Sequence, residues 1–76
     1  MVDMNAVEDY RVQLGIPKST IAKKCEISVN TYDNWKNKPD MVSAKCAKAL
    51  ADALMITEPS QIIAIFFAPN VQNNVN

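Results

Sequence analysis

Apolar side chains recur at every third or fourth position through most of the chain, a spacing that is typical of amphipathic helices. No segment shows the sustained alternation of apolar and polar residues that marks a half-buried strand. The pattern predicts five helices and no strand, which indicates an all-α domain. The predicted helices span residues 5–14, 18–25, 29–35, 44–54 and 60–68.

Capping residues and helix breakers mark the ends of these segments. Asp3 or Asn5 can cap the first helix, and Gly15 can end it in a left-handed conformation. Ser28 and Ser43 stand immediately before the third and fourth helices, where a serine hydroxyl accepts a hydrogen bond from a backbone N–H two or three residues on. The predicted boundaries therefore have a chemical cause at both ends of the first helix and at the start of the third and fourth helices.

A chain of 76 residues, about half of them apolar, is long enough for one small hydrophobic core. We expect residues 1–68 to form a single domain. Pro69 should stop the fifth helix, and residues 69–76 have the polar composition of a flexible tail.

The predicted helices have inner stripes that can be named by residue. In the second and third helices we expect the buried residues to be Ile21, Ala22, Cys25, Tyr32 and Trp35. In the fourth helix we expect them to be Cys46, Ala47, Leu50, Ala53 and Leu54. A buried tyrosine also needs a partner for its hydroxyl, so the third helix must lie near a polar group.

The fifth helix is apolar on nearly every side, and one small core cannot cover all of it. One side should pack on the first and fourth helices, and the remaining side is a candidate dimer surface. An edge strand formed by residues 71–76 is an alternative dimer contact. The residues expected at the dimer surface are Ile62, Ile65, Phe66 and Phe67.

The formal net charge is zero, but the basic residues are clustered. All eight lie between Arg11 and Lys48, a segment with only three acidic residues and therefore a net charge of +5. Such a distribution creates a local positive field in a neutral protein. It is compatible with nucleic-acid binding and equally with a solvated lysine face.

Several classes of function lack the residues that they require. The chain has no histidine, no glycine-rich phosphate loop and no carboxylate pair at a useful spacing, so we do not expect an enzyme. The spacing of Cys25 and Cys46 matches no metal motif, and we expect both thiols to be small buried apolar groups in a reducing cytosol. We expect no cofactor, metal or small-molecule ligand. The longest apolar run, 62–68, is too short to cross a bilayer, which favours a soluble cytoplasmic protein.

The second and third helices and their short turn carry a more specific pattern. Counting from Lys18 as the first position, the fifth position is Ala22, which is small where two helices must cross closely. The tenth position, Ile27, can bury the turn, and Tyr32 and Trp35 can pack the later helix back onto the earlier one. These positions together are the pattern of a helix-turn-helix.

The stretch GIPKSTIAKKCEISVNTYDNWKNKP resembles the second and third helices and following loop of the lambda-repressor-like family (Cro/CI-type, XRE) of phage and bacterial regulators. The resemblance extends over roughly residues 7–67 and implies a five-helix fold with a helix-turn-helix at helices two and three. It also implies that the third helix enters the major groove of a palindromic operator, which a homodimer binds. The family usually has glycine where this chain has Glu26, and a left-handed Glu26 would cost about 1 kcal/mol.

The resemblance also assigns roles by position. Six residues would face base edges: Ser28, Val29, Asn30, Thr31, Asp33 and Asn34. Five would contact phosphates: Lys18, Lys36, Asn37, Lys38 and Lys45. Asparagine can bond adenine N6 and N7, and valine can pack on a thymine methyl. Asp33 can accept from cytosine N4, or it can hold a neighbouring side chain and contact no base.

These features lead us to expect a sequence-specific regulator of transcription that binds double-stranded DNA. Since no second domain for effector sensing is evident, a phage Cro-like repressor in the bacterial cytoplasm or an infected cell fits best. The alternative is a protein-binding helix-turn-helix module, such as an antitoxin or antirepressor, that uses the apolar fifth helix.

Overall fold

The computed structural model describes residues 1–67, which form five α-helices and one short 3₁₀ helix. The elements are α1 (Met4–Leu14), α2 (Lys18–Cys25), α3 (Val29–Asn34), η1 (Pro39–Met41), α4 (Ala44–Ala53) and α5 (Pro59–Phe66). No strand occurs within residues 1–67, so the predicted all-α class is confirmed. The predicted tail, the helix stop at Pro69 and the alternative edge strand lie outside the described residues.

Side-chain caps explain why α1, α3 and α4 begin within one residue of their predicted starts. The Asp3 carboxylate accepts from the N–H of Ala6 at 3.2 Å, which places the cap of α1 at Asp3. The Ser28 hydroxyl accepts from the N–H of Thr31, and Ser43 caps α4 in the same way, both at 3.1 Å. These bonds satisfy N–H groups that have no partner inside the helix.

Two connections differ from a simple loop. The polar segment before α4 contains the 3₁₀ helix η1, which begins at Pro39 because proline's fixed φ suits a first helical position. After α4 the chain turns through Met55, a non-glycine residue with a φ of 57°. The sequence pattern predicted neither the 3₁₀ helix nor the left-handed turn. At Met55 no glycine marks the turn.

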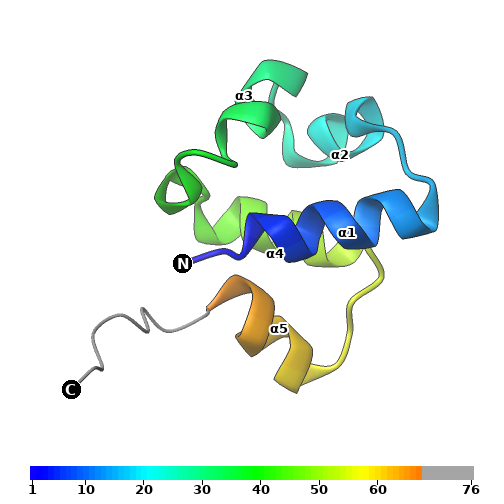
Figure 1. Ribbon diagram of the computed structural model, residues 1–76, viewed down its shortest axis with the longest axis vertical. Coiled ribbons are helices and arrows are strands. Elements are labelled where there is room, and N and C mark those ends of the chain that lie inside the picture. The colour runs from blue at the N-terminus through cyan, green and yellow to red at the C-terminus, as the bar shows by residue number, and fades with distance from the viewer. Residues whose placement is uncertain (68–76) are drawn as a thin grey trace.

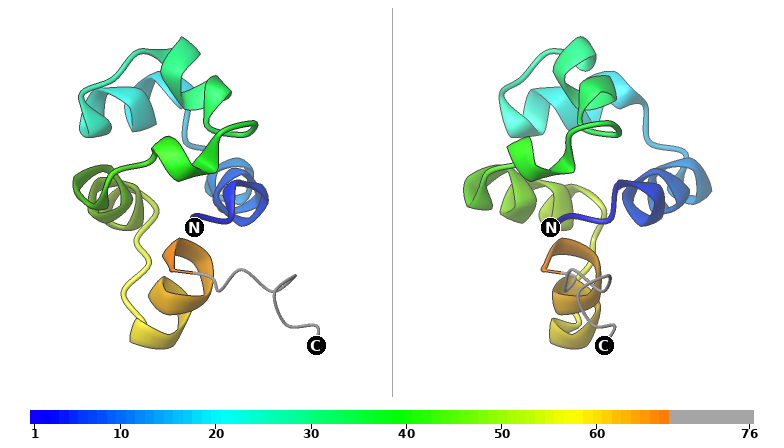
Figure 2. Two further views of the ribbon diagram at one scale, coloured as in Figure 1. Left: turned by 90° about the vertical axis from the view of Figure 1, so that its left-hand side faces the viewer. Right: turned by 60° about the vertical axis from the view of Figure 1, so that its left-hand side comes forward.

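The helices are arranged so that α3 lies far from α5. In Figures 1 and 2, α2 and α3 lie together at one end, α1 and α4 cross the middle, and α5 lies at the opposite end. α2 packs on both α3 and α4, and α1 packs on α5. Any partner of α3 therefore approaches a different end of the molecule from a partner of α5.

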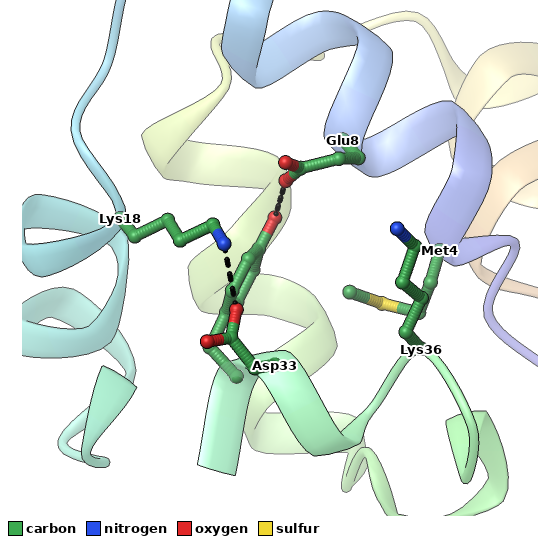
Figure 3. A pocket seen from close by; sticks show the side chains of 6 residues that line it. Met4, Glu8, Lys18, Asp33 and Lys36 are labelled. Carbon is green, nitrogen blue, oxygen red and sulfur yellow. Dashed lines mark hydrogen bonds and ion pairs between the residues drawn. The ribbon is translucent and has the colours of Figure 1, made fainter. Parts of the chain in front are cut away.

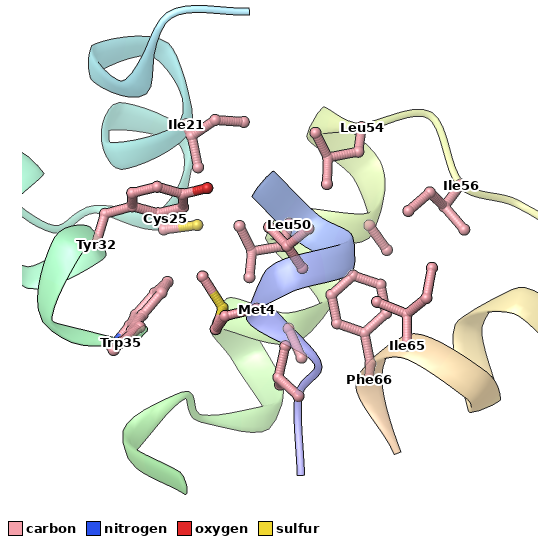
Figure 4. Packing of buried hydrophobic residues seen from close by; sticks show 14 residues of the cluster. Met4, Ile21, Cys25, Tyr32, Trp35, Leu50, Leu54, Ile56, Ile65 and Phe66 are labelled. Carbon is pink, nitrogen blue, oxygen red and sulfur yellow. The ribbon is translucent and has the colours of Figure 1, made fainter. Parts of the chain in front are cut away.

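One core connects all five α-helices (Figure 4). Every predicted inner residue of α2 and α3 is buried, and Tyr32 and Trp35 are each only 3% exposed. In α4, Ala47, Leu50 and Leu54 are buried as expected, whereas Cys46 and Ala53 are half-buried at the edge of the core. The fully buried side chains are Ile21, Leu50, Leu54 and Val7.

The structure corrects the predicted dimer surface on α5. Ile65 and Phe66 are 7% and 3% exposed because this side of α5 packs into the core, so neither is available to a second chain. The opposite side carries Ile63 and Phe67, each 59% exposed. Ile62 is half-buried at the margin. A helix that is apolar all round does not reveal which side the core will take, and for that reason the prediction was wrong at these two positions.

Hydrogen bonds also attach α5 to Asp3, which precedes α1, and to α1 itself. The N–H of Asp3 donates to the carbonyl of Ile65 at 2.7 Å, and the Gln61 amide donates to the Tyr10 hydroxyl at 3.2 Å.

No helix within residues 1–67 has both the length and the apolarity to span a membrane.

Candidate nucleic-acid interface

The candidate interface is the exposed side of α3. Both aromatic rings of this short helix point into the core, where their centroids lie 6.1 Å apart at an interplanar angle of 59°. Burial of these rings leaves the opposite side in solvent. The exposed residues there are Val29, Asn30, Asp33 and Asn34. The side chains of Asn30 and Asn34 make no hydrogen bond within residues 1–67.

The hydroxyl of Ser28 caps α3 as predicted, and the hydroxyl of Thr31 takes part in the same cap. They lie 3.0 Å apart and are hydrogen-bonded to each other, and the Ser28 oxygen also accepts from the Thr31 N–H. These bonds cap α3. Ser28 is exposed and Thr31 is half-buried. Both residues lie beside the exposed side of α3 and fix its first turn.

A hydrogen-bond network on α1 holds α3 in place. The Tyr32 hydroxyl donates to the Glu8 carboxylate at 2.7 Å, and Arg11 donates to the same carboxylate from Nε at 2.8 Å and from Nη2 at 2.7 Å. Arg11 also donates to the carbonyl of Ile16 at 2.8 Å. The network is the partner that a buried tyrosine requires, and it connects α3, α1 and the turn before α2.

Charge, hydrogen bonding and burial in this network shift the pKa values of Glu8 and Tyr32. The hydrogen bonds from Arg11 hold the pKa of Glu8 at about 2, against the desolvation that acts in the opposite direction. Burial raises the pKa of Tyr32, and its bond to Glu8 raises that pKa further. Glu8 is therefore a charged acceptor and Tyr32 a neutral donor across the physiological range. The sequence pattern did not identify Glu8, because Tyr32 lies 24 residues further along the chain, and it therefore did not identify Arg11, which holds Glu8. The Tyr32 hydroxyl, which needed a partner, was the available clue.

The turn between α2 and α3 is tight and left-handed at Glu26. Its φ and ψ are 60° and 44°, which confirms the left-handed conformation considered for this residue. The N–H of Ile27 donates to the carbonyl of Ala22 at 2.9 Å, and this bond closes the end of α2. Glu26 also lies 3.3 Å from the Lys45 ammonium, in a highly exposed ion pair that contributes little stability.

A second ion pair crosses the exposed side of α2 and α3. The Lys18 ammonium lies 2.8 Å from the Asp33 carboxylate, and each side chain is less than half exposed (Figure 3). This geometry supports the interpretation in which Asp33 holds a neighbouring side chain. Lys18 and Asp33 help to line a recess of about 250 Å³ between α1, α2 and α3. The other residues that line it are Met4, Glu8, Tyr32 and Lys36.

The predicted phosphate contacts fall into two groups. Lys36, Asn37 and Lys38 follow α3 directly and are exposed, and neither lysine makes an ion pair within the described part of the chain. Lys18 and Lys45 are exposed or half-exposed but are paired with Asp33 and Glu26. Unpaired positive charge therefore lies just beyond the C-terminal end of α3.

No group of three or more histidine, cysteine, aspartate or glutamate residues that could hold a metal ion occurs in residues 1–67. Comparisons with protein-family models, with curated proteins and with solved structures found no match. The chemistry of this surface must therefore be inferred from its own residues.

Proposed function

We propose that the protein is a sequence-specific regulator of transcription, in which α2 and α3 act as a helix-turn-helix and α3 reads the major groove of double-stranded DNA. The observation that carries this proposal is the exposed side of α3. Asn30 and Asn34 project from it with no side-chain hydrogen bond to any of residues 1–67, while Tyr32 and Trp35 are buried behind it. A helix that presents amide groups on its exposed side suits the recognition of base edges.

The residue types on this side match the chemistry of the groove. Each asparagine amide has a donor and an acceptor that can bond the N7 and N6 of adenine, and a good bidentate pair gives about 1–3 kcal/mol of discrimination. Val29, which is 37% exposed, can contact a thymine methyl. Because Asp33 is already paired with Lys18, we infer that it orients Lys18 rather than reading a base.

Phosphate contacts would come from the residues that flank α3. Lys36, Asn37 and Lys38 are exposed beyond its C-terminal end, where they can fix the register of the helix in the groove. The Lys45–Glu26 ion pair is highly exposed and worth about 0–1 kcal/mol, so a DNA phosphate can replace the Glu26 carboxylate at small cost. The Lys18–Asp33 pair is less than half exposed, and Lys18 would contact a phosphate while Asp33 orients it.

We further propose that the protein acts as a homodimer on a palindromic operator, as a phage Cro-like repressor in the cytoplasm of a bacterium or an infected cell. Two copies of α3 would then enter half-sites about one helical turn apart. The exposed apolar residues Ile63 and Phe67, at the end of the molecule opposite α3, are the candidate dimer contact in place of Ile65 and Phe66.

Selection of bound duplexes from a random pool, followed by sequencing, tests the proposal directly. We expect an enriched palindromic site. Replacement of Asn30 or Asn34 by alanine should relax the preference at particular base pairs. Lys36→Ala should weaken binding to all sequences alike and reduce the salt slope by about one per subunit. Lys48→Ala is the matched control, because Lys48 lies beside the recess formed by α4 and α5 and should not contact DNA.

One observation favours a second candidate function. Ile63 and Phe67 are each 59% exposed, and the net charge of the chain is zero, as expected for a module that binds another protein through α5. An antitoxin or antirepressor would use this surface. A gel shift with random duplex separates the two proposals: binding that weakens steeply with salt supports DNA recognition, and no shift at micromolar protein in low salt supports the protein-binding module.

A further inference from the structure

The two cysteines are distant in sequence but adjacent in the fold. Cys25 is the last residue of α2, and Cys46 lies in the first turn of α4. The Cys25 thiol donates to the carbonyl of Cys46 at an Sγ–O distance of 3.9 Å, and the Cys46 thiol donates to the carbonyl of Cys25 at 3.8 Å. Each sulfur thus lies against the backbone of the other residue.

This reciprocal arrangement favours bond formation between the two sulfurs. Because α2 already packs on α4, closure of the disulfide would join two helices that are in contact and would replace two weak thiol hydrogen bonds by a covalent bond. Neither thiol belongs to the exposed side of α3, so DNA recognition leaves this pair without a role.

We propose that Cys25 and Cys46 are a redox-responsive pair that closes to an intramolecular disulfide when a small-molecule disulfide, such as oxidised glutathione, accepts their electrons. This inference goes beyond the proposed regulator function and does not depend on it. The disulfide would enclose residues 26–45, a segment that contains α3 and η1, and would anchor that segment to α2 and α4.

The reaction has two thiol–disulfide exchange steps. The Cys46 thiolate attacks one sulfur of oxidised glutathione, forms a mixed disulfide and releases one glutathione thiolate, which takes up a proton. The Cys25 thiolate then attacks the Cys46 sulfur, forms the Cys25–Cys46 bond and releases the second glutathione. The protein loses two electrons and two protons, and one oxidised glutathione becomes two reduced ones.

Accessibility sets the order of these steps. Cys46 is half-buried, whereas Cys25 is only 6% exposed. Burial raises the pKa of the Cys25 thiol to about 11, and the neighbouring Cys46 contributes to the same shift. Cys46 is therefore the thiol that meets the external disulfide, and Cys25 is the resolving thiol.

Intact-mass analysis of the full chain after incubation with oxidised glutathione tests the proposal. The wild-type protein should lose the mass of two hydrogen atoms and retain no glutathione. Cys25→Ser should stop at the mixed disulfide and keep one glutathione, and Cys46→Ser should remain unmodified. A wild-type protein that keeps glutathione as Cys25→Ser does, or that links two chains, would overturn the inference.

A second measurement uses only the wild-type protein, so it stands even if a serine variant fails to fold. The effective concentration of the two thiols is obtained from the disulfide equilibrium in glutathione buffers, for the native and for the urea-unfolded chain. We expect it to be about tenfold higher in the native state, because the fold holds the thiols together. An equal or lower native value contradicts the proposal, and a failed DNA gel shift leaves it unaffected.

Discussion

The hydroxyl of Tyr32 donates a 2.7 Å hydrogen bond to the carboxylate of Glu8, and this bond joins α3 to α1. Arg11 holds the same carboxylate through two further hydrogen bonds, so the acceptor of the Tyr32 hydroxyl is itself held in position on α1. The proposed recognition helix is therefore oriented by a charged group on another helix as well as by packing of its own rings.

Removal of the Tyr32 hydroxyl tests the contribution of this bond. Tyr32→Phe should lower the free energy of unfolding by about 1–2 kcal/mol, because a hydrogen bond to a charged acceptor is lost inside the protein. Urea unfolding followed by circular dichroism measures the change. Tyr10→Phe is the matched control: its hydroxyl accepts a 3.2 Å bond from Gln61 at an exposed site, and its loss should cost less than about 0.5 kcal/mol.

Acid should weaken the same network. The pKa of Glu8 is about 2 in the folded protein and ordinary in the unfolded chain, so the unfolded chain binds the proton more readily. The stabilisation is therefore complete above pH 5 and is lost progressively as the pH falls from about 5 to 2. In the wild-type protein the free energy of unfolding should fall between pH 7 and pH 3, as measured by urea unfolding at both pH values. In Glu8→Gln this fall should be smaller by about 1–2 kcal/mol. An unchanged pH dependence in Glu8→Gln would mean that other carboxylates cause the acid loss.

Two non-glycine residues within residues 1–67 have a left-handed backbone, and replacement of either by glycine should stabilise the protein. Glu26 has a φ of 60° and Met55 a φ of 57°, and both side chains are exposed. Glu26→Gly and Met55→Gly should each raise the free energy of unfolding by about 0.5–1 kcal/mol, because the steric cost at Cβ disappears. Thermal unfolding measures the gain. If only Met55→Gly stabilises, the exposed ion pair of Glu26 with Lys45 offsets the relief of strain.

The last residue of α5, Phe66, and the residue that follows it, Phe67, should respond differently to truncation. Phe66 is 3% exposed and Phe67 is 59% exposed. Phe66→Ala should cost about 3–5 kcal/mol of stability, since it leaves a cavity in the core. Phe67→Ala should change stability by less than about 0.5 kcal/mol and weaken self-association, which sedimentation measures. A dimer that survives Phe67→Ala unchanged would place the dimer contact elsewhere.

Removal of the Lys18–Asp33 ion pair should increase the affinity of the protein for duplex DNA. Asp33→Asn removes a negative charge from the side of α3 and frees Lys18, so binding to random duplex at low salt should tighten by about threefold to tenfold. Asp52→Asn makes the same charge change on α4, beside the recess near α5, and should have a smaller effect. Weaker and less selective binding by Asp33→Asn would instead identify Asp33 as a base-reading residue.

At α5 the sequence pattern does not determine which side of the helix is buried. The apolar pattern identified a helix one residue short of its observed start at Pro59, but Ile63, Ile65, Phe66 and Phe67 are equally apolar, so nothing local distinguishes the buried side from the exposed one. Docking against α1 made that choice. At Tyr32 the pattern predicted burial correctly and indicated that a hydroxyl partner was needed, but it did not identify Glu8.

The sequence by itself determined the features that depend on neighbours within about four residues: the helices, the serine and aspartate caps, the left-handed end of α1 at Gly15, and the alternation that buries Tyr32 and Trp35 while exposing Asn30 and Asn34. These features follow from backbone hydrogen bonds and helical periodicity, which are local. Only the tertiary structure decided which charges pair and which thiols meet. The Lys18–Asp33 pair, the Glu8–Tyr32 bond and the Cys25–Cys46 contact each join different helices, and their distances depend on how those helices pack rather than on residue spacing along the chain.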